Sequence, residues 1–456
     1  MQDTSRDKGS SGQTGLRARA ISGTALTVVS FGGQNALRLA SNLILTRLLF
    51  PEDFGLMALV QVVIAGLGMF SDIGLHAAIV QDKRGDDPVF LNTAWTLQIG
   101  RGVLLWIVIL LLAVPVAGFY EAPLLAQLLP VAGLVVVIQG MNSMRMATAN
   151  RSLHLGRLTA MTLGTKAFGV VVTVLLALWL QSVWALVLGS LVGTSLLMLL
   201  SHIVLPGHRD RLHFEMSAAG QLFRFGGYIF LATIAGFFVN QGDRAILGKF
   251  VSLDVLAIYN IGLFIATVPV MVGRAVMRRV MFPLYARRPP SEHEDNALKI
   301  AKARRLCTAA LLAFSAVMAL VGVPLIEILY DARYHGAAPV ASLVALAYLP
   351  VVITVSYHNL PLAAGHSGRF AALVTGIALM QTAALFLGLS LAGLGGAILA
   401  PGLAAILAYP AMVWLIRPYR SWDPLHDAVA AGAMLAIIAA TLALHGAALE
   451  PLFRPL

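Results

Sequence analysis

The sequence predicts an all-α, polytopic membrane protein with two lobes of six helices each, followed by one or two further helices at its C-terminal end. Three observations predict this fold: an apolar composition, a division into helix-length apolar segments, and a weak internal repeat. Of the 456 residues, 59% are hydrophobic and 12% are charged, whereas soluble domains carry about 25% charged residues. A chain this apolar cannot bury its surface in water by itself, which excludes a string of soluble domains.

The apolar segments are each long enough to cross the hydrocarbon core of a bilayer, which takes about 20 residues of helix. Short stretches rich in Gly, Pro and charged residues separate most of them, and longer connectors are expected at 206–217 and 283–305. Thirteen segments are predicted, at 22–49, 53–80, 89–118, 124–148, 158–180, 183–205, 218–241, 253–282, 306–329, 337–363, 370–391, 394–416 and 426–448.

The distribution of basic residues predicts how these segments are oriented. If the N-terminal tail is cytoplasmic, 23 of the 32 Lys and Arg residues fall on the cytoplasmic side, 5 on the opposite side and 4 inside spans. This bias agrees with the positive-inside rule. The net charge of +11 is therefore interpreted as membrane topology, and no nucleic-acid partner is expected. Residues 1–21 are polar and rich in Ser and Gly, which predicts a disordered cytoplasmic tail.

A weak internal repeat relates the two halves of the chain. Residues 44–57 (ILTRLLFPEDFGLM) parallel residues 246–259 (ILGKFVSLDVLAIY), and shorter matches further on keep the same order. Because each half has an even number of spans, the halves should share one orientation, with an axis along the membrane normal and a central pathway between them. We therefore expect an N-terminal lobe at 22–205, a cytoplasmic linker at 206–217, a C-terminal lobe at 218–416, and an appended transmembrane helix and tail at 417–456.

The first span is unusually polar along one face. Gln34, Arg38 and Asn42 recur every four residues, which places them on the same side of a helix. A lipid-facing Arg38 near midspan would cost at least about 2.5–3.5 kcal/mol, so this face should point into a bundle or an aqueous cavity. The alternative is a structural arginine that is bound to carbonyl groups or to a carboxylate such as Asp72.

Other basic residues lie in or near the ends of spans. Arg101 is predicted in the third span and Lys166 in the fifth, whereas Arg224, Arg274 and Arg278 lie close to cytoplasmic ends. The first two are candidates for a substrate cavity, and the last three for its cytoplasmic entrance. For Lys166, Arg224, Arg274 and Arg278, the alternative is snorkelling of the side chain to the headgroups.

Acidic residues inside the spans are fewer. Asp72 and His76 are four residues apart, which makes them either a proton-responsive coupling pair or a hydrogen bond at a helix end. The excess of positive charge favours an anionic substrate, and arginine is well suited to bind phosphate groups.

Signatures of soluble enzymes are absent from the sequence. It has no P-loop, HExxH, GxGxxG or GxSxG motif, and its single cysteine, Cys307, excludes an intrachain disulfide and a cysteine-based metal site. We expect no catalytic residues, metal or cofactor. Gly189 and Gly193 form a small-xxx-small pattern, which is interpreted as a surface for helix packing.

Several stretches resemble the polysaccharide transport family, which includes Wzx-type oligosaccharide flippases and belongs to the superfamily of multidrug, oligosaccharidyl-lipid and polysaccharide exporters. The similarity extends over about residues 22–416. The stretches that carry it are 42–55 (NLILTRLLFPEDFG), 70–81 (FSDIGLHAAIVQ), 91–95 (LNTAW) and 243–249 (DRAILGK), with Tyr259 and Phe282-Pro283.

This resemblance implies alternating access between two six-helix lobes in the bacterial inner membrane, with a polyprenyl-diphosphate-linked oligosaccharide as substrate. The product would serve lipopolysaccharide, O-antigen or exopolysaccharide synthesis, with membrane lipids and possible polymerase and glycosyltransferase partners. In such a mechanism Arg38 and Arg101 would contact the diphosphate, Gln34 and Asn42 would contact sugar hydroxyls, and Arg274 and Arg278 would gather the anion. Three alternatives stay open: a cation-coupled multidrug exporter, a membrane enzyme of glycan assembly, and a scaffold that does not transport.

Overall fold

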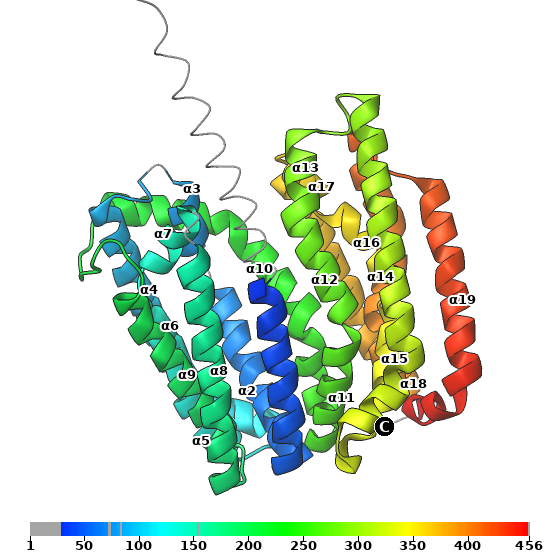
Figure 1. Cartoon of the computed structure of the whole chain (residues 1–456), viewed down its shortest axis with the longest axis horizontal. Coiled ribbons are helices and arrows are strands. Elements are labelled where there is room, and N and C mark those ends of the chain that lie inside the picture. The colour runs from blue at the N-terminus through cyan, green and yellow to red at the C-terminus, as the bar shows by residue number, and fades with distance from the viewer. Residues whose placement is uncertain (1–28, 72–73, 83, 153–154, 455–456) are drawn as a thin grey trace, which may run out of the picture. The chain divides into compact units, whose positions relative to one another are not determined.

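The computed structural model describes residues 29–71, 74–82, 84–152 and 155–454. Within these ranges all regular secondary structure is helical, and no strand is present. In the part of the chain that the structure describes, seven helices are long and apolar enough to cross a membrane, or up to ten if each of three bent helix pairs forms one span. The predicted all-α membrane fold is therefore confirmed (Figure 1), while the total of thirteen spans stays a prediction.

The chain divides into two compact units. The first unit contains residues up to Leu49 together with Val63–Phe230, and the second contains Phe50–Val62 and Leu231–Leu456. The helices of the first unit are a helix at 29–48, the end of α2 (Pro51–Phe70), α3 (Leu75–Gln81), α4 (Pro88–Phe119), α5 (Leu125–Ala132), α6 (Leu134–Gly140), α7 (Arg145–Arg151), α8 (Leu155–Leu180), α9 (Trp184–Ile203) and the start of α10 (Met216–Phe250).

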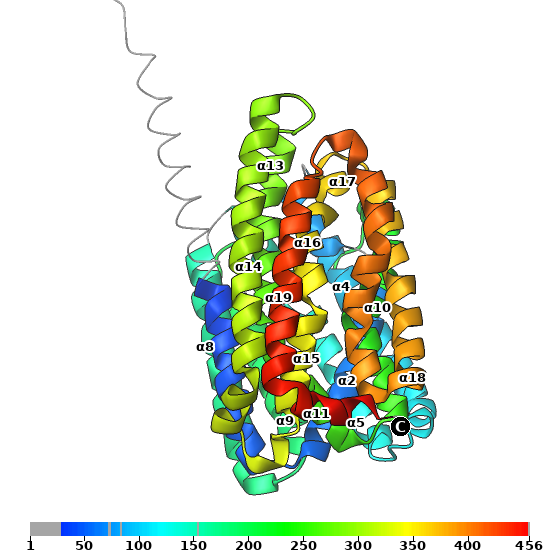
Figure 2. The same ribbon diagram turned by 90° about the vertical axis from the view of Figure 1, so that its right-hand side faces the viewer.

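The second unit contains the rest of the helices, and within it α19 runs alongside α14 (Figure 2). Besides parts of α2 and α10, its elements are α11 (Leu253–Ala266), α12 (Val268–Val276), the π-helix η1 (Met277–Met281), α13 (Phe282–Arg287), α14 (Glu294–Leu329), η2 (Ala332–Tyr334), α15 (Ala337–Ala347), α16 (Leu349–His358), α17 (Leu360–Ala363), α18 (Ser367–Ile416), η3 (Arg417–Tyr419), α19 (Pro424–Leu449) and η4 (Glu450–Phe453).

Prolines and glycines set the bends in the second unit. The axis turns by 47° between Leu253–Ala266 and Val268–Arg287, and by 45° between Ala332–Ala347 and Leu349–Ala363. Pro269 and Pro350 follow these bends directly, because proline lacks an N–H donor and fits best at the start of a helix. In α18 the helix breaks at Ala392 and Gly393, where Gly393 has a φ of 56°, so the predicted boundary between 370–391 and 394–416 is confirmed.

The predicted connector at 283–305 is wrong for most of its length. α13 continues to Arg287 and α14 begins at Glu294, so only residues 288–293 lie between the two helices. Two features extend α14 beyond its apolar part: acidic residues in its first turn, which favour the positive end of the helix dipole, and a pair between Asp295 and Lys299 at 2.6 Å. Hydropathy detects the apolar part of a helix and misses such a polar extension.

The connector at 206–215 is held to the first turns of α4 by hydrogen bonds. The backbone N–H groups of Arg211, His213 and Glu215 donate to the side chains of Asn92, Thr96 and Thr93 at 2.9, 3.0 and 3.1 Å, respectively. α10 then begins at Met216. This segment, predicted as part of a linker, is therefore fixed along its length to the first unit.

The predicted helix-packing role of the Gly189–Gly193 pattern is confirmed. A Cβ atom on Gly189 would lie 2.0 Å from the Thr173 side chain of α8, and one on Gly193 would lie 3.3 Å from the Cα of Gly169. The two glycines of α9 thus allow α8 and α9 to approach each other closely, as small residues do in membrane helix pairs.

Candidate functional site

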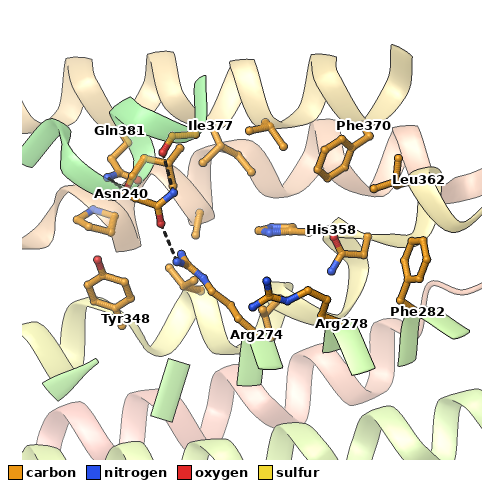
Figure 3. Close-up of a pocket in the computed structure, with 18 residues that line it drawn as sticks. Asn240, Arg274, Arg278, Phe282, Tyr348, His358, Leu362, Phe370, Ile377 and Gln381 are labelled. Carbon is orange, nitrogen blue, oxygen red and sulfur yellow. Dashed lines mark hydrogen bonds between the residues drawn. The ribbon is translucent and has the colours of Figure 1, made fainter. Parts of the chain in front are cut away.

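A cavity of about 510 Å³ lies inside the second unit. Its walls come from α10, from α12 with η1, from the bend between α15 and α16, and from α18 (Figure 3). The polar residues that line it are Asn240, Arg274, Arg278, Tyr348, His358, Asn359 and Gln381, and none of the described lining residues is acidic. The cavity is therefore lined by positive charge, amide groups and aromatic rings.

Two arginines carry the positive charge of this cavity. Arg274 lies in the last turn of α12, and its Nη1 donates to Asn240 Oδ1 at 2.9 Å. Arg278 lies one turn later, in the π-helix η1, and the described part of the chain gives it no hydrogen bond or ion pair. π-Helical turns within α-helices are frequent at functional sites. Both side chains are exposed, so their donors are available to a ligand in the cavity.

Neutral polar residues complete the cavity wall. Asn240 is oriented by its own Nδ2, which donates to the Gly236 carbonyl at 2.6 Å, and Gln381 is oriented by a 3.1 Å donation from its Nε2 to the Val239 carbonyl. Tyr348 and His358 also line the cavity and lie near the two arginines (Figure 3). These residues are not among those predicted from the sequence, although single amides such as Gln381 within apolar segments were a detectable signal.

A buried carboxylate lies on the same helix as Asn240. Asp243 is 6% exposed and accepts hydrogen bonds from the Tyr259 hydroxyl at 2.6 Å and from the Arg244 backbone at 2.8 Å. The Arg244 guanidinium in turn donates to Asn260 Oδ1 at 2.6 Å. This network fixes α10 against α11 and so holds the Asn240 side of the cavity in place.

In the first unit, three of the predicted substrate residues come together. Lys166 Nζ lies 3.3 Å from Gln34 Oε1, and Gln34 Nε2 donates to Ser30 Oγ at 3.1 Å. Arg38 is exposed on the same helix and lies close enough to Lys166 for mutual repulsion. Asn42 follows one turn later and is half-buried. The predicted polar face of the first span therefore meets α8 at Lys166.

Arg101 makes a different kind of contact from the other candidates. Its Nε donates to Ser71 Oγ at 3.0 Å, and its Nη2 donates to the Gly68 carbonyl at 2.6 Å. Both partners lie at the C-terminal end of α2, where a positive charge stabilises the negative end of the helix dipole. The structure thus gives Arg101 a structural partner, and its predicted contact with substrate stays a prediction.

Three candidate residues cannot be placed in the same way. Asp72 lies outside the described residues, and the side chains of His76 in α3 and Arg224 in α10 also lie outside them. The predicted coupling pair and the predicted role of Arg224 at the entrance stay predictions. Among the described residues, no group of three or more His, Cys, Asp or Glu is arranged to hold a metal ion.

Comparison with known proteins decides the family. A family model described as polysaccharide biosynthesis protein matches residues 44–339, which is more than half of the chain. The chain belongs to the polysaccharide biosynthesis protein family. Similar proteins are the lipopolysaccharide biosynthesis protein WzxC of Escherichia coli (strain K12), 23% identical over 73% of this chain and 67% of that protein, and the succinoglycan biosynthesis transport protein ExoT of Rhizobium meliloti (strain 1021), 23% identical over 70% of this chain and 64% of that protein. The predicted resemblance to the polysaccharide transport family is thereby confirmed.

Solved structures of other proteins share the fold of this family member. It is similar to the lipid II flippase MurJ in an inward closed conformation, with a TM-score of 0.69 and 11% identity over 92% of this chain and 93% of that chain. A multidrug resistance MATE family transporter in an inward-facing conformation gives a TM-score of 0.61 and 13% identity over 91% and 96% of the two chains. At these identities the comparison establishes the fold, and the chain is a multi-pass membrane protein.

Proposed function

We propose that this family member is a flippase that moves a polyprenyl-diphosphate-linked oligosaccharide from the cytoplasmic to the periplasmic leaflet, by alternating access, for cell-surface polysaccharide biosynthesis. The observation that carries the proposal is the cavity with Arg274 and Arg278, which is cationic and lies within an apolar membrane unit. The names of WzxC and ExoT, which refer to lipopolysaccharide biosynthesis and succinoglycan biosynthesis transport, support the substrate class.

The chemistry of the cavity fits an anionic, hydroxylated headgroup. Guanidinium groups bind phosphate oxygens through two parallel hydrogen bonds, and the low dielectric inside the membrane strengthens such contacts. Asn240 holds Arg274 in position, while Asn359 and Gln381 provide amide groups for sugar hydroxyls. In this proposal Arg274 and Arg278 receive the diphosphate during translocation.

The polar residues of the first unit have a second role in the proposal. Arg38 and Lys166 contact the diphosphate, while Gln34 and Asn42 contact sugar hydroxyls. Arg101 acts mainly through α2, because its donors already bind the end of that helix. Outward movement of two uncompensated negative charges would gain roughly 4–5 kcal/mol per 100 mV of inside-negative potential, so transport needs no ATP site.

The multidrug exporter alternative shares the fold but fits the cavity less well. Cationic drugs or coupling cations require carboxylates, and none of the described residues that line the cavity is acidic. The comparison with the MATE transporter establishes the fold alone at 13% identity. The charge of the cavity therefore favours an anionic substrate over a cationic one.

The direct test is replacement of the two arginines in a strain that lacks the chromosomal gene. We expect Arg274→Gln and Arg278→Gln each to reduce surface polysaccharide about 10-fold or more, because a hydrogen bond to a charged group contributes about 1.5–3 kcal/mol. Lipid-linked repeat units should accumulate in the cytoplasmic leaflet. Arg279→Gln is the matched control, since Arg279 is adjacent and exposed but does not line the cavity. Full export by a variant that carries both Arg274→Gln and Arg278→Gln, at normal protein levels, would refute the proposal.

The proposed localisation is the bacterial inner membrane, with the N-terminus in the cytoplasm. Alkaline phosphatase and green fluorescent protein fused after the connectors at 206–215 and 288–293 test this orientation, since both connectors carry arginines and should be cytoplasmic. Polymerase and glycosyltransferase partners would be sought by crosslinking in the same strain. Active phosphatase fusions at either connector would contradict the proposed orientation.

A further inference from the structure

A second cavity of the second unit lies between α14 and α19 and forms a groove of about 580 Å³. Leu425 and Val429 in its wall are 72% and 66% exposed, so the groove is open on the outer surface of the second unit. The small side chains of Ala309, Ala313 and Ala433 leave space between the two helices. Apart from one end, the wall consists of aliphatic side chains, and an aliphatic chain is the ligand it fits.

The exception is the end of the groove where Arg305 and His426 lie. The Arg305 side chain is 56% exposed, and the described structure gives His426 Nε2, which is buried, no hydrogen-bond partner. Thr308, three residues after Arg305 on α14, also lines the groove. Lys302 is exposed one turn earlier on the same face of α14 as Arg305. The exposed side chains of Lys302 and Arg305 therefore offer donors to a negatively charged group at this end of the groove.

The positive charge at this end exceeds the negative charge that balances it. Arg304 and Arg305 share a single carboxylate, that of Asp423, at 3.4 and 2.8 Å. The other acidic residue nearby, Asp427, is 6% exposed and accepts hydrogen bonds from the Tyr357 and Tyr409 hydroxyls at 2.7–2.9 Å. The Asp427 carboxylate is thus directed into the protein and away from the groove. The charge at this end of the groove is therefore positive and comes from Lys302 and Arg305.

We propose that this groove is a binding site for an anionic phospholipid of the cytoplasmic leaflet, with its phosphate at Lys302 and Arg305 and one acyl chain between α14 and α19. The basic residues of α14 and the start of α19 lie on the predicted cytoplasmic side, where anionic lipids attract basic residues near the membrane surface. The bound lipid bridges α14 and α19, and α19 is the helix that stands outside the internal repeat. This site is separate from the cavity proposed for the oligosaccharide substrate and does not depend on that proposal.

The length of the groove selects a phospholipid over a longer polyprenyl chain. From Leu425 to Ile437 the groove follows α19 for about 18 Å, at about 1.5 Å per residue. One leaflet of the hydrocarbon core is about 15 Å deep, half of about 30 Å. The groove is therefore as long as one acyl chain of one leaflet, and a much longer chain would have most of its length outside it.

The test is native mass spectrometry of the full-length protein in detergent, with phosphatidylglycerol, phosphatidylethanolamine or a polyprenyl phosphate added in turn. We expect preferential binding of phosphatidylglycerol, and about 5-fold weaker binding for each cation removed in Lys302→Gln and Arg305→Gln. Ala433→Leu should fill the groove and abolish binding, whereas Ala428→Leu should leave it unchanged. Ala428 is also an exposed alanine of α19 but does not line the groove.

Three results would overturn the inference. Equal binding of phosphatidylglycerol and phosphatidylethanolamine would show that the basic end selects no anion, and preferred binding of the polyprenyl phosphate would assign the groove to another ligand. Displacement of the lipid by millimolar inorganic phosphate would show that the groove itself contributes nothing. If Ala433→Leu fails to fold, the Lys302→Gln/Arg305→Gln variant decides, because both of its side chains are exposed.

Discussion

Replacement of Arg304 by methionine tests how α19 is fixed to the second unit. Arg304 is 1% exposed, its Nη2 lies 3.4 Å from Asp423, and its Nη1 donates to the Ser421 carbonyl. Its guanidinium carbon lies 4.7 Å from the centre of the Tyr357 ring. One side chain of α14 therefore contacts both α16 and the segment that leads into α19, so its removal should loosen the attachment of α19.

The expected loss is about 3 kcal/mol. Removal of one partner from a buried ion pair costs about 3–5 kcal/mol, and a desolvated cation–π contact contributes about 2 kcal/mol. Two effects reduce the total: Asp423 keeps Arg305 as a partner at 2.8 Å, and the substitution abolishes the desolvation cost of a guanidinium whose Nε has no partner in the described structure. For a unit of this size, 3 kcal/mol lowers the Tm by roughly 6–12 °C.

The adjacent residue is the matched control for this measurement. Arg305 binds the same carboxylate, but its side chain is 56% exposed, so Arg305→Met should cost no more than about 1 kcal/mol. Both variants are compared by thermal unfolding of purified protein in one detergent, followed by tryptophan fluorescence. A Tm for Arg304→Met equal to or above that of Arg305→Met would refute the reasoning, because burial is the main difference between the two sites.

The remaining predictions concern the first unit. Gly189→Val should destabilise the packing of α8 on α9 by about 1–3 kcal/mol, because a Cβ there would lie 2.0 Å from the Thr173 side chain of α8. Gly164 lies in open space on α8, so Gly164→Ala should stabilise the protein by up to about 1 kcal/mol in the same unfolding assay, because alanine favours a helix more than glycine does. The hydrogen bond from Arg84 lowers the pKa of Asp87 below its ordinary value of 3.8, so the stabilisation it gives should be complete at neutral pH and lost as acid protonates the folded carboxylate. The Tm values of wild type and Asp87→Asn should therefore converge below pH 3.8. A difference in Tm that stays the same at all pH values would contradict this assignment. Arg101→Ala should lower the Tm and the protein level together, since its contacts to α2 contribute about 1.5–3 kcal/mol each; lost export at unchanged Tm would instead indicate contact with substrate.

The extent of a helix could be predicted where the thickness of the membrane determines it. A span must satisfy its backbone internally over about 20 apolar residues, so the segments 89–118 and 426–448 correspond closely to α4 and α19. The start of α14 was not predictable in the same way, because the helix continues through polar residues outside the apolar run. Its extension depends on local pairs such as Asp295–Lys299, which a hydropathy profile does not detect.

Some of the residues that line the cavity could be predicted from the sequence, and others could not. Arg274 and Arg278 could be identified as candidates because a cation in an apolar segment is costly and needs a polar environment. Asn240, Tyr348 and His358 are neutral, so their cost is lower and their positions in the sequence are less conspicuous. They converge through the bends before Pro269 and Pro350, and only the folded chain shows that these bends surround one space.

Arg101 and Arg274 show why a charged residue within a span does not by itself define a binding site. In the sequence both are arginines within apolar segments, and both must find acceptors. In the structure Arg101 binds Gly68 and Ser71 at the end of α2, whereas Arg274 is held by the Asn240 side chain at the wall of a cavity. Helix-end carbonyls satisfy a guanidinium permanently, but one neutral amide oxygen leaves it most of its donors and its full charge. The evidence for an anionic substrate therefore comes from Arg274 and Arg278, whose charge faces a cavity without acidic residues among those described.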